Sequence, residues 1–252
     1  MARLEKFYLF CIVLGFLSLA IYVYGYFNRE FIVVSSNLIF PLYAFLPTLT
    51  AYIAARKYGL KSVVGYILLA FSIGLLFWTI GEVVWSIYVL SYSIEVPFPS
   101  IADIFYLLGY PLLYFGLFSY LRVFKDAINN KIITASSIIG VIVVIATGVL
   151  IIPEALYSSG NLIEAVLSIV YPIFDAILII LAIIGVMMFL GGRIVISWIL
   201  ISIGFILLGI VDLSYYYQNL LGLIWEGHPL ELIWLWSYLH LAAAFYNHSK
   251  QI

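Results

Sequence analysis

Two acidic residues recur in this chain with the same surroundings, each inside an apolar segment long enough to cross a membrane. Glu82 follows the sequence Ser72-Ile73-Gly74, and Asp212 follows Ser202-Ile203-Gly204, so the matched positions are 130 residues apart (82 and 212). An ionisable side chain within a bilayer is costly and by default indicates a functional site. Because it occurs twice at equivalent positions, the pattern predicts a site between two similar halves of one fold.

Further polar side chains are expected at the same depth. Asp175 lies near the middle of its apolar segment, and Tyr110 and His240 each lie eleven residues after a proline. At about 1.5 Å per residue, Glu82 and Asp212 lie roughly 14 Å below the outer ends of their helices, close to the middle of the bilayer. The predicted ligand-binding or proton-relay groups are Glu82, Asp212, His240 and Asp175, with Trp85, Tyr110 and Tyr215 as walls of the site.

Each of these groups also has a structural explanation. A protonated carboxyl group can hydrogen-bond a neighbouring helix, and the imidazole of His240 can be satisfied by a tyrosine or a backbone carbonyl. The functional interpretation is that Glu82 and Asp212 act together and that His240 is the partner of Asp212. His228 and His248 flank the last helix at opposite ends, which disfavours a haem site. Catalytic zinc usually takes three close protein ligands, so we expect neither a metal nor a cofactor.

Three polar residues are expected at helix starts near the outer end of this site. Ser100 and Asp103 have the spacing of a capping box, in which the two side chains satisfy backbone groups of the first turn. Glu231 follows Pro229 in the first turn of the last helix, where an acid suits the helix dipole. The same residues would ring the outer mouth of any cavity that reaches the two repeated acids.

The composition is that of an integral membrane protein. Of 252 residues, 66% are hydrophobic and only 9% are charged, unlike any water-soluble domain of this length. A bilayer core of about 30 Å needs roughly 20 apolar residues per helix. We therefore predict an all-α fold with about eight transmembrane helices in a single domain, residues 1–252. The apolar runs are 7–27, 31–54, 63–91, 101–121, 132–152, 161–190, 194–222 and 229–247.

The repeat extends beyond the acids. Residues 40–43 (Phe-Pro-Leu-Tyr) match residues 171–174 (Tyr-Pro-Ile-Phe). The matches pair the first four helices with the last four and give repeat halves of approximately 1–128 and 129–252. Because four helices return the chain to its starting side, both halves enter the membrane from the same side. This predicts a parallel repeat, unlike the inverted repeats of many transporters.

Basic residues predict the orientation in the membrane. Ten of the 11 Lys and Arg residues fall in alternate connections, and only Arg29 lies on the other side. Positively charged loops stay inside, so we predict a cell-membrane protein with both termini in the cytoplasm. This orientation explains the basic loops without a nucleic-acid partner. The first run exceeds the length of a signal-peptide core and is interpreted as a retained helix. Cys11, the only cysteine, cannot form an internal disulfide.

A set of motifs lies between Gly81 and Gly116. It comprises Gly-Glu-x-x-Trp at 81–85, Pro-Phe-Pro-Ser at 97–100 and Tyr-Pro at 110–111, and Trp-Leu-Trp follows at 234–236. These segments resemble the multi-pass N-terminal membrane sensory regions of prokaryotic histidine kinases and diguanylate cyclases. The resemblance implies a sensory role. Because the chain ends at Ile252 with no output domain, we expect either signalling through a separate partner protein or a homodimer, or a stand-alone relative with another role.

Four classes of function remain open, and the lipid bilayer is the expected partner in all of them. The leading prediction is a ligand-binding or sensory module with an outward-facing polar site for an unknown small ligand. A small proton- or cation-coupled secondary transporter would also use intramembrane acids in two halves. A structural subunit of a larger membrane complex would pair the acids with a partner helix. An intramembrane enzyme is the weakest alternative, since the chain offers no convincing nucleophile or metal set.

Overall fold

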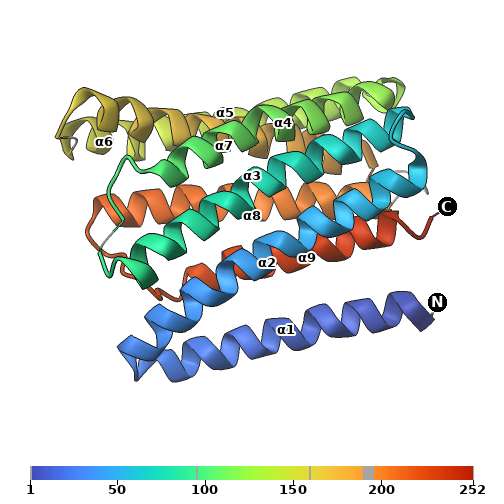
Figure 1. Ribbon diagram of the computed structural model, residues 1–252. Helices are drawn as coiled ribbons and strands as arrows, with labels where there is room; N and C mark the ends of the chain where they lie inside the picture. Colours follow the sequence, from blue (N-terminus) through green and yellow to red (C-terminus); the bar gives the residue numbers. More distant parts are fainter. Residues whose placement is uncertain (1, 95, 159, 190–195, 252) are drawn as a thin grey trace.

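The computed structural model describes residues 2–94, 96–158, 160–189 and 196–251, and the regular structure in these ranges is helical. The long helices that follow one another along the chain run antiparallel and form one bundle (Figure 1). The helices are α1 (Ala2–Tyr26), α2 (Arg29–Tyr58), α3 (Val63–Ser91), α4 (Ile101–Val123), α5 (Asn130–Leu150), α6 (Ile152–Ser158), α7 (Leu162–Phe189), α8 (Ile196–Leu220) and α9 (Glu231–His248), with a 3-10 turn at Lys125–Ala127.

The protein is a polytopic helical membrane protein. Among the described residues, seven segments are long and apolar enough to cross a bilayer: α1, α2, α3, α4, α5 continued into α6, α7 and α8. Large apolar side chains on the flanking helices are exposed, as expected for contact with lipid. Phe16 on α1 is 68% exposed and Val149 on α5 is 65% exposed. Burial of such side chains inside the protein is unnecessary where the solvent is hydrocarbon.

The eighth predicted run is present as α9, but it differs from the other seven. It has 18 residues, and one acid, two histidines and an asparagine lower its apolar character, so it is not among the membrane-length apolar segments. It packs against α1, α2 and α8, and most of its residues are buried. Because neighbouring helices shield α9 from lipid, it tolerates polar side chains that a lipid-facing helix could not.

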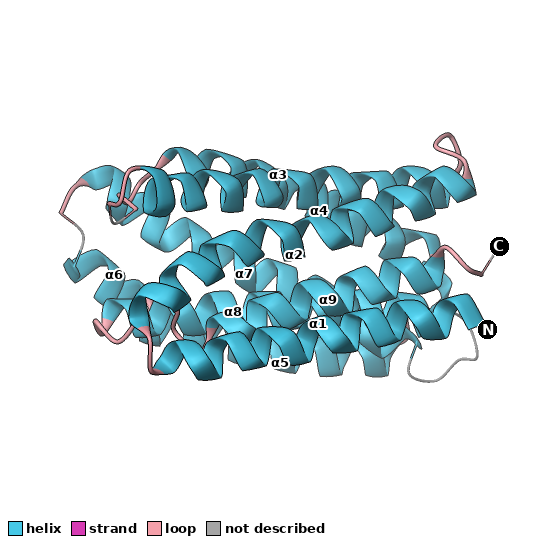
Figure 2. Ribbon diagram, turned by 60° about the horizontal axis from the view of Figure 1, so that its bottom comes forward, coloured by secondary structure: helices cyan, strands magenta, loops and turns pink. Residues whose placement is uncertain are grey.

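Both chain termini lie at the same end of the bundle (Figure 1). We call the opposite end the distal end. It is formed by the turn after α1, residues 27–28, by residues 92–94 and 96–100, by α6 with residues 160–161, and by residues 221–230 (Figures 1 and 2). The candidate site lies beneath these segments.

The half of the bundle nearer the termini contains an aromatic plug, which we define as Phe71, Phe205 and Phe245. These side chains come from α3, α8 and α9 and are fully buried. The ring of Phe71 lies 5.3 Å from that of Phe205 and 5.7 Å from that of Phe245, between centroids. Next to the plug, Trp198 stacks on Tyr120 at 4.1 Å. Close aromatic packing of this kind fills the space between α3, α8 and α9 at this level.

Two glycines allow the central helices to approach their neighbours closely. A Cβ atom on Gly74 of α3 would lie 2.8 Å from Cδ2 of Leu113 on α4. A Cβ atom on Gly204 of α8 would lie 2.4 Å from Cδ2 of Leu241 on α9. Small residues at such crossings are typical of membrane helix packing, where van der Waals contact drives association.

Candidate functional site

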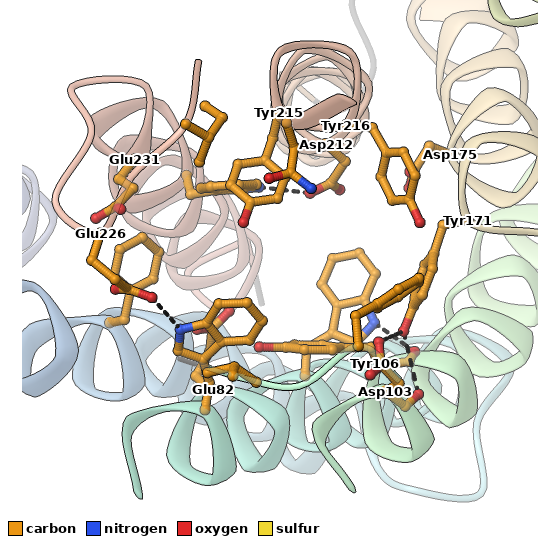
Figure 3. Close-up of a pocket in the computed structure, with 18 of the residues that line it drawn as sticks. Glu82, Asp103, Tyr106, Tyr171, Asp175, Asp212, Tyr215, Tyr216, Glu226 and Glu231 are labelled. Carbon is orange, nitrogen blue, oxygen red and sulfur yellow. Dashed lines mark hydrogen bonds between the residues drawn. The ribbon is translucent and has the colours of Figure 1, made fainter. Parts of the chain in front are cut away.

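A cavity of about 460 Å³ opens within the distal half of the bundle (Figure 3). Its walls come from α2, α3, α4, α7, α8 and α9, and residues 96–98 and 224–226 of two connections contribute to its mouth. The volume is within the range of small-molecule binding sites. Seven of the twelve acidic residues of the chain line it: Glu82, Asp103, Glu164, Asp175, Asp212, Glu226 and Glu231.

Three acids form the deep part of the cavity, and the donors that they bind are neutral side chains. The hydroxyl of Tyr110 donates to Oδ1 of Asp175 at 2.5 Å. The indole nitrogen of Trp234 donates to Oδ1 of Asp212 at 2.6 Å, and the hydroxyl of Tyr238 donates to Oε1 of Glu82 at 3.3 Å.

These bonds connect α4 with α7, α8 with α9 and α3 with α9. Figure 3 shows Asp175 and Asp212 on one side of the cavity and Glu82 on the other. The deep acids therefore join helices around the cavity and also face a common space.

Of the predicted capping residues, Asp103 and Glu231 line the cavity. Ser100 and Asp103 form a capping box at the start of α4, with the backbone nitrogen of Ser100 2.6 Å from Oδ2 of Asp103. The free oxygen of Asp103 accepts a hydrogen bond of 2.7 Å from the hydroxyl of Tyr171 on α7. Asp103 therefore combines a helix cap with a contact across the cavity, whereas Ser100 does not line the cavity.

Glu231 stabilises the turn that enters α9. Its Oε1 accepts from the backbone nitrogens of Gly227 at 2.8 Å and His228 at 3.2 Å, and its Oε2 accepts from the hydroxyl of Tyr22 on α1 at 2.5 Å. In the same connection, partial burial and the nearby Arg29 lower the pKa of His228 below its usual value. A neutral His228 can accept the hydrogen bond that the backbone nitrogen of Leu230 donates to its Nδ1 at 3.1 Å.

The connection between α8 and α9 crosses the mouth through Glu226. One carboxylate oxygen accepts from the indole nitrogen of Trp85 on α3, and the other accepts from the amide of Asn37 on α2, both at 3.1 Å. Glu226, Glu164 and Asn37 were not among the site residues predicted from the sequence. In the sequence, Glu226 is an acid between two apolar runs, and nothing there indicates that its connection folds back over the bundle.

Aromatic side chains cover much of the cavity wall. The predicted walls Trp85, Tyr110 and Tyr215 all line the cavity. Tyr215 lies 4.9 Å from Trp234 between ring centroids. Further aromatic residues that line the cavity, and that the predicted set did not contain, are Phe40, Trp78, Phe98, Tyr106, Tyr171, Tyr216, Trp225, Trp234 and Tyr238.

His240 does not belong to the site, contrary to the prediction that it is the partner of Asp212. Its Nε2 lies 2.9 Å from the carbonyl oxygen of Leu200, and its ring lines a separate groove beside Cys11 of α1. The reason is helical geometry. Trp234 and Tyr238, four residues apart, present one face of α9 to the cavity, and His240 is rotated by about 200° from Tyr238. The partner of Asp212 is Trp234 instead.

The acids are spread around the cavity wall and do not converge on one point. Among the described residues, no group of three or more His, Cys, Asp or Glu side chains could hold a metal ion. The arrangement is thus a large polar and aromatic chamber, suited to a molecule that touches several walls at once. Comparisons with protein-family models, curated proteins and solved structures found no match.

Proposed function

We propose that this protein is a ligand-binding module of the cell membrane, of the kind that serves as a sensor, with its binding site in the distal cavity. The observation that carries the proposal is the cavity itself. It is a chamber of about 460 Å³ lined by Glu82, Asp175 and Asp212, on helices that span the membrane. Intramembrane acids that only join helices have no need of such a volume beside them.

The distribution of basic residues supports an orientation with the cavity facing outwards. Lys and Arg residues cluster in the connections at the end that holds both termini: Arg56, Lys57, Lys61, Arg122, Lys125 and Lys131. Arg29 lies at the distal end, and Arg193 lies outside the described residues. By the positive-inside rule, the termini are cytoplasmic and the cavity opens to the exterior.

The arrangement of helices supports two parallel repeat halves around the cavity. In this repeat, α1, α2, α3 and α4 correspond to α5, α7, α8 and α9, in that order. Exchange of the two halves therefore turns the contact between α2 and α9 into a contact between α7 and α4. Both contacts occur. The close approach of Gly74 to α4 is likewise equivalent to that of Gly204 to α9. Glu82 and Asp212 are then symmetry mates that face one chamber from opposite halves.

The motifs that resemble sensory membrane regions coincide with the cavity wall. Glu82, Trp85, Asp103 and Tyr110 belong to the segment between residues 81 and 116, and all four line the cavity, as does Trp234 of the later motif. If this protein senses a ligand as those membrane regions do, the motifs that it has in common with them are expected to form the wall of the binding site. Signalling would then pass from α3, α4 and α9 to a separate partner or a second copy of the chain.

Transport remains the second candidate function, because the two halves contribute equivalent acids to one chamber. It requires a second state in which the cavity opens towards the termini. The aromatic plug of Phe71, Phe205 and Phe245 fills the space between α3, α8 and α9 on that side, and a binding function needs no such opening.

The proposal is tested by ligand-induced stabilisation of the purified protein in lipid nanodiscs. A library of small polar and amphipathic compounds is screened for those that raise the unfolding temperature, since a ligand that binds only the folded state stabilises it. We expect at least one compound to stabilise the wild type and the Glu30→Gln variant, whose acid is exposed at the distal end but does not line the cavity. The Glu82→Gln variant should lose most of this stabilisation. Equal stabilisation of Glu82→Gln would refute the assignment of the site.

A further inference from the structure

The chemistry of the cavity identifies the class of its ligand. We infer that it binds an organic cation, an ammonium or guanidinium group carried on an apolar or aromatic body. This inference rests on the proposed ligand-binding function and adds the charge and shape of the ligand.

The first argument is the charge of the wall. Seven acids line the cavity, and none of the described lining residues is Lys, Arg or His. The hydrogen bonds that the deep acids accept come from Tyr110, Trp234 and Tyr238, which carry no charge. Each of these acids that is ionised repels an anionic ligand and is left without a counter-charge by a neutral one.

The second argument is the state of Asp175. Its side chain is only 1% exposed, and Oδ1 accepts the hydrogen bond from Tyr110. Oδ2 has no hydrogen-bond donor among the described residues, and the residue lines the cavity. Oδ2 is not one of the fully buried side-chain atoms that lack a partner, so it is open to the cavity, where a donor on a ligand can bind it. Asp212 lines the same side of the cavity as Asp175 (Figure 3).

The third argument is the aromatic surface around these acids. A cation over the face of a tryptophan or tyrosine ring is attracted by the ring electrons, and the attraction is stronger where water is excluded. Tyr215 and Trp234 lie 4.9 Å apart beside Asp212. Tyr106 stands on the side of Glu82 (Figure 3), and Trp85 lines the cavity from the same helix as Glu82. Carboxylates between ring faces suit an ammonium head, and the remaining ring surface suits an apolar body.

The size of the chamber excludes a bare inorganic ion as its occupant. Ca²⁺ takes six to eight oxygen ligands at about 2.3–2.6 Å, which requires converging groups. The described residues provide no such convergence, and a volume of about 460 Å³ is far larger than one ion. The acids instead lie at two levels, deep (Glu82, Asp175 and Asp212) and at the mouth (Asp103, Glu164, Glu226 and Glu231). A dication can therefore contact both levels.

The test uses matched probes that differ in charge but little in shape. The cationic probes are 2-phenylethylamine, benzyltrimethylammonium and 1,4-diaminobutane, and the neutral ones are 2-phenylethanol and 1,4-butanediol. The full chain in uncharged-lipid nanodiscs is melted near neutral pH with each probe at up to about 10 mM, enough to detect dissociation constants in the millimolar range.

We expect the cationic probes to raise the unfolding temperature and the matched alcohols not to do so. Asp175→Asn and Asp212→Asn keep the size of each side chain and an oxygen for the existing donor. Each should weaken the apparent affinity for the amines by about tenfold or more, because the ligand loses a charge-assisted hydrogen bond to the protein. Asp126→Asn, an exposed acid near the opposite end, is the control and should leave the affinity unchanged.

Four results would overturn the inference. If the alcohols stabilise the protein as well as the amines do, the cavity binds ligands but is not a cation site. The same conclusion follows if an uncharged library compound alone stabilises the wild type and loses this effect in Glu82→Gln. If the amines stabilise all variants equally, they bind elsewhere. If no cationic probe stabilises the protein, the acids serve only to join the helices. Should Asp175→Asn fail to fold, Asp212→Asn and Glu82→Gln provide the same comparison.

Discussion

Removal of the Tyr110 hydroxyl tests whether the deep acids are held as the structure indicates. Tyr110 is 3% exposed and donates to Asp175, which is 1% exposed, across the contact between α4 and α7. In Tyr110→Phe, Oδ1 of Asp175 loses this donor. Hydrogen bonds to charged groups contribute about 1.5–3 kcal/mol in soluble proteins, but side-chain bonds within membranes average about 0.6 and reach about 1.7 kcal/mol. Because water in the adjacent cavity can partly replace the donor, we expect a cost of about 1–2 kcal/mol.

The matched control is Tyr114→Phe, one turn further along the same helix. The hydroxyl of Tyr114 donates to the backbone carbonyl of Phe174 at 2.7 Å, a neutral acceptor, so its loss should cost only about 0.5 kcal/mol. Both variants are measured by reversible unfolding in mixed detergent micelles, with a double-mutant cycle between Tyr110→Phe and Asp175→Ala. We expect a coupling energy of about 1 kcal/mol. If Tyr110→Phe costs no more than Tyr114→Phe, or costs the same after Asp175→Ala, this description of the deep acids is wrong.

The remaining predictions concern topology and packing. In a Cys11→Ser background, Asn219→Cys at the cavity mouth should react with a membrane-impermeant thiol reagent added to intact cells. Lys61→Cys should react only after the cells are permeabilised. The reverse pattern would show that the proposed orientation is wrong. Gly204→Ala should lower the free energy of unfolding by about 1–3 kcal/mol in the same assay, because its Cβ would lie 2.4 Å from Leu241. Gly148→Ala has open space around its Cβ and should leave this free energy unchanged or raise it by up to about 1 kcal/mol. Phe71→Ala should cost about 3–5 kcal/mol because it empties the centre of the aromatic plug, and a cost below about 1 kcal/mol would show that the plug is not closely packed.

Local patterns in the sequence determined much of what the structure contains. Each of the eight apolar runs became one long helix, because in a bilayer the backbone must satisfy its hydrogen bonds internally. The capping box at Ser100 and Asp103 is likewise a local device, which needs only a spacing of three residues. The three intramembrane acids were recognisable because a carboxyl group in an apolar run is rare whatever surrounds it. All three line the cavity.

What only the tertiary structure decided is the direction in which each side chain points and what it meets there. His240 was expected beside Asp212 because the two lie at similar depth, but depth does not determine the rotation of α9, and Trp234 occupies that position instead. Glu226 joined the site because its connection folds back to α2 and α3. The polar residues of α9 are accommodated because neighbouring helices cover it. Rotation, loop path and shielding arise from packing between distant segments, and periodicity along one segment carries no information about them.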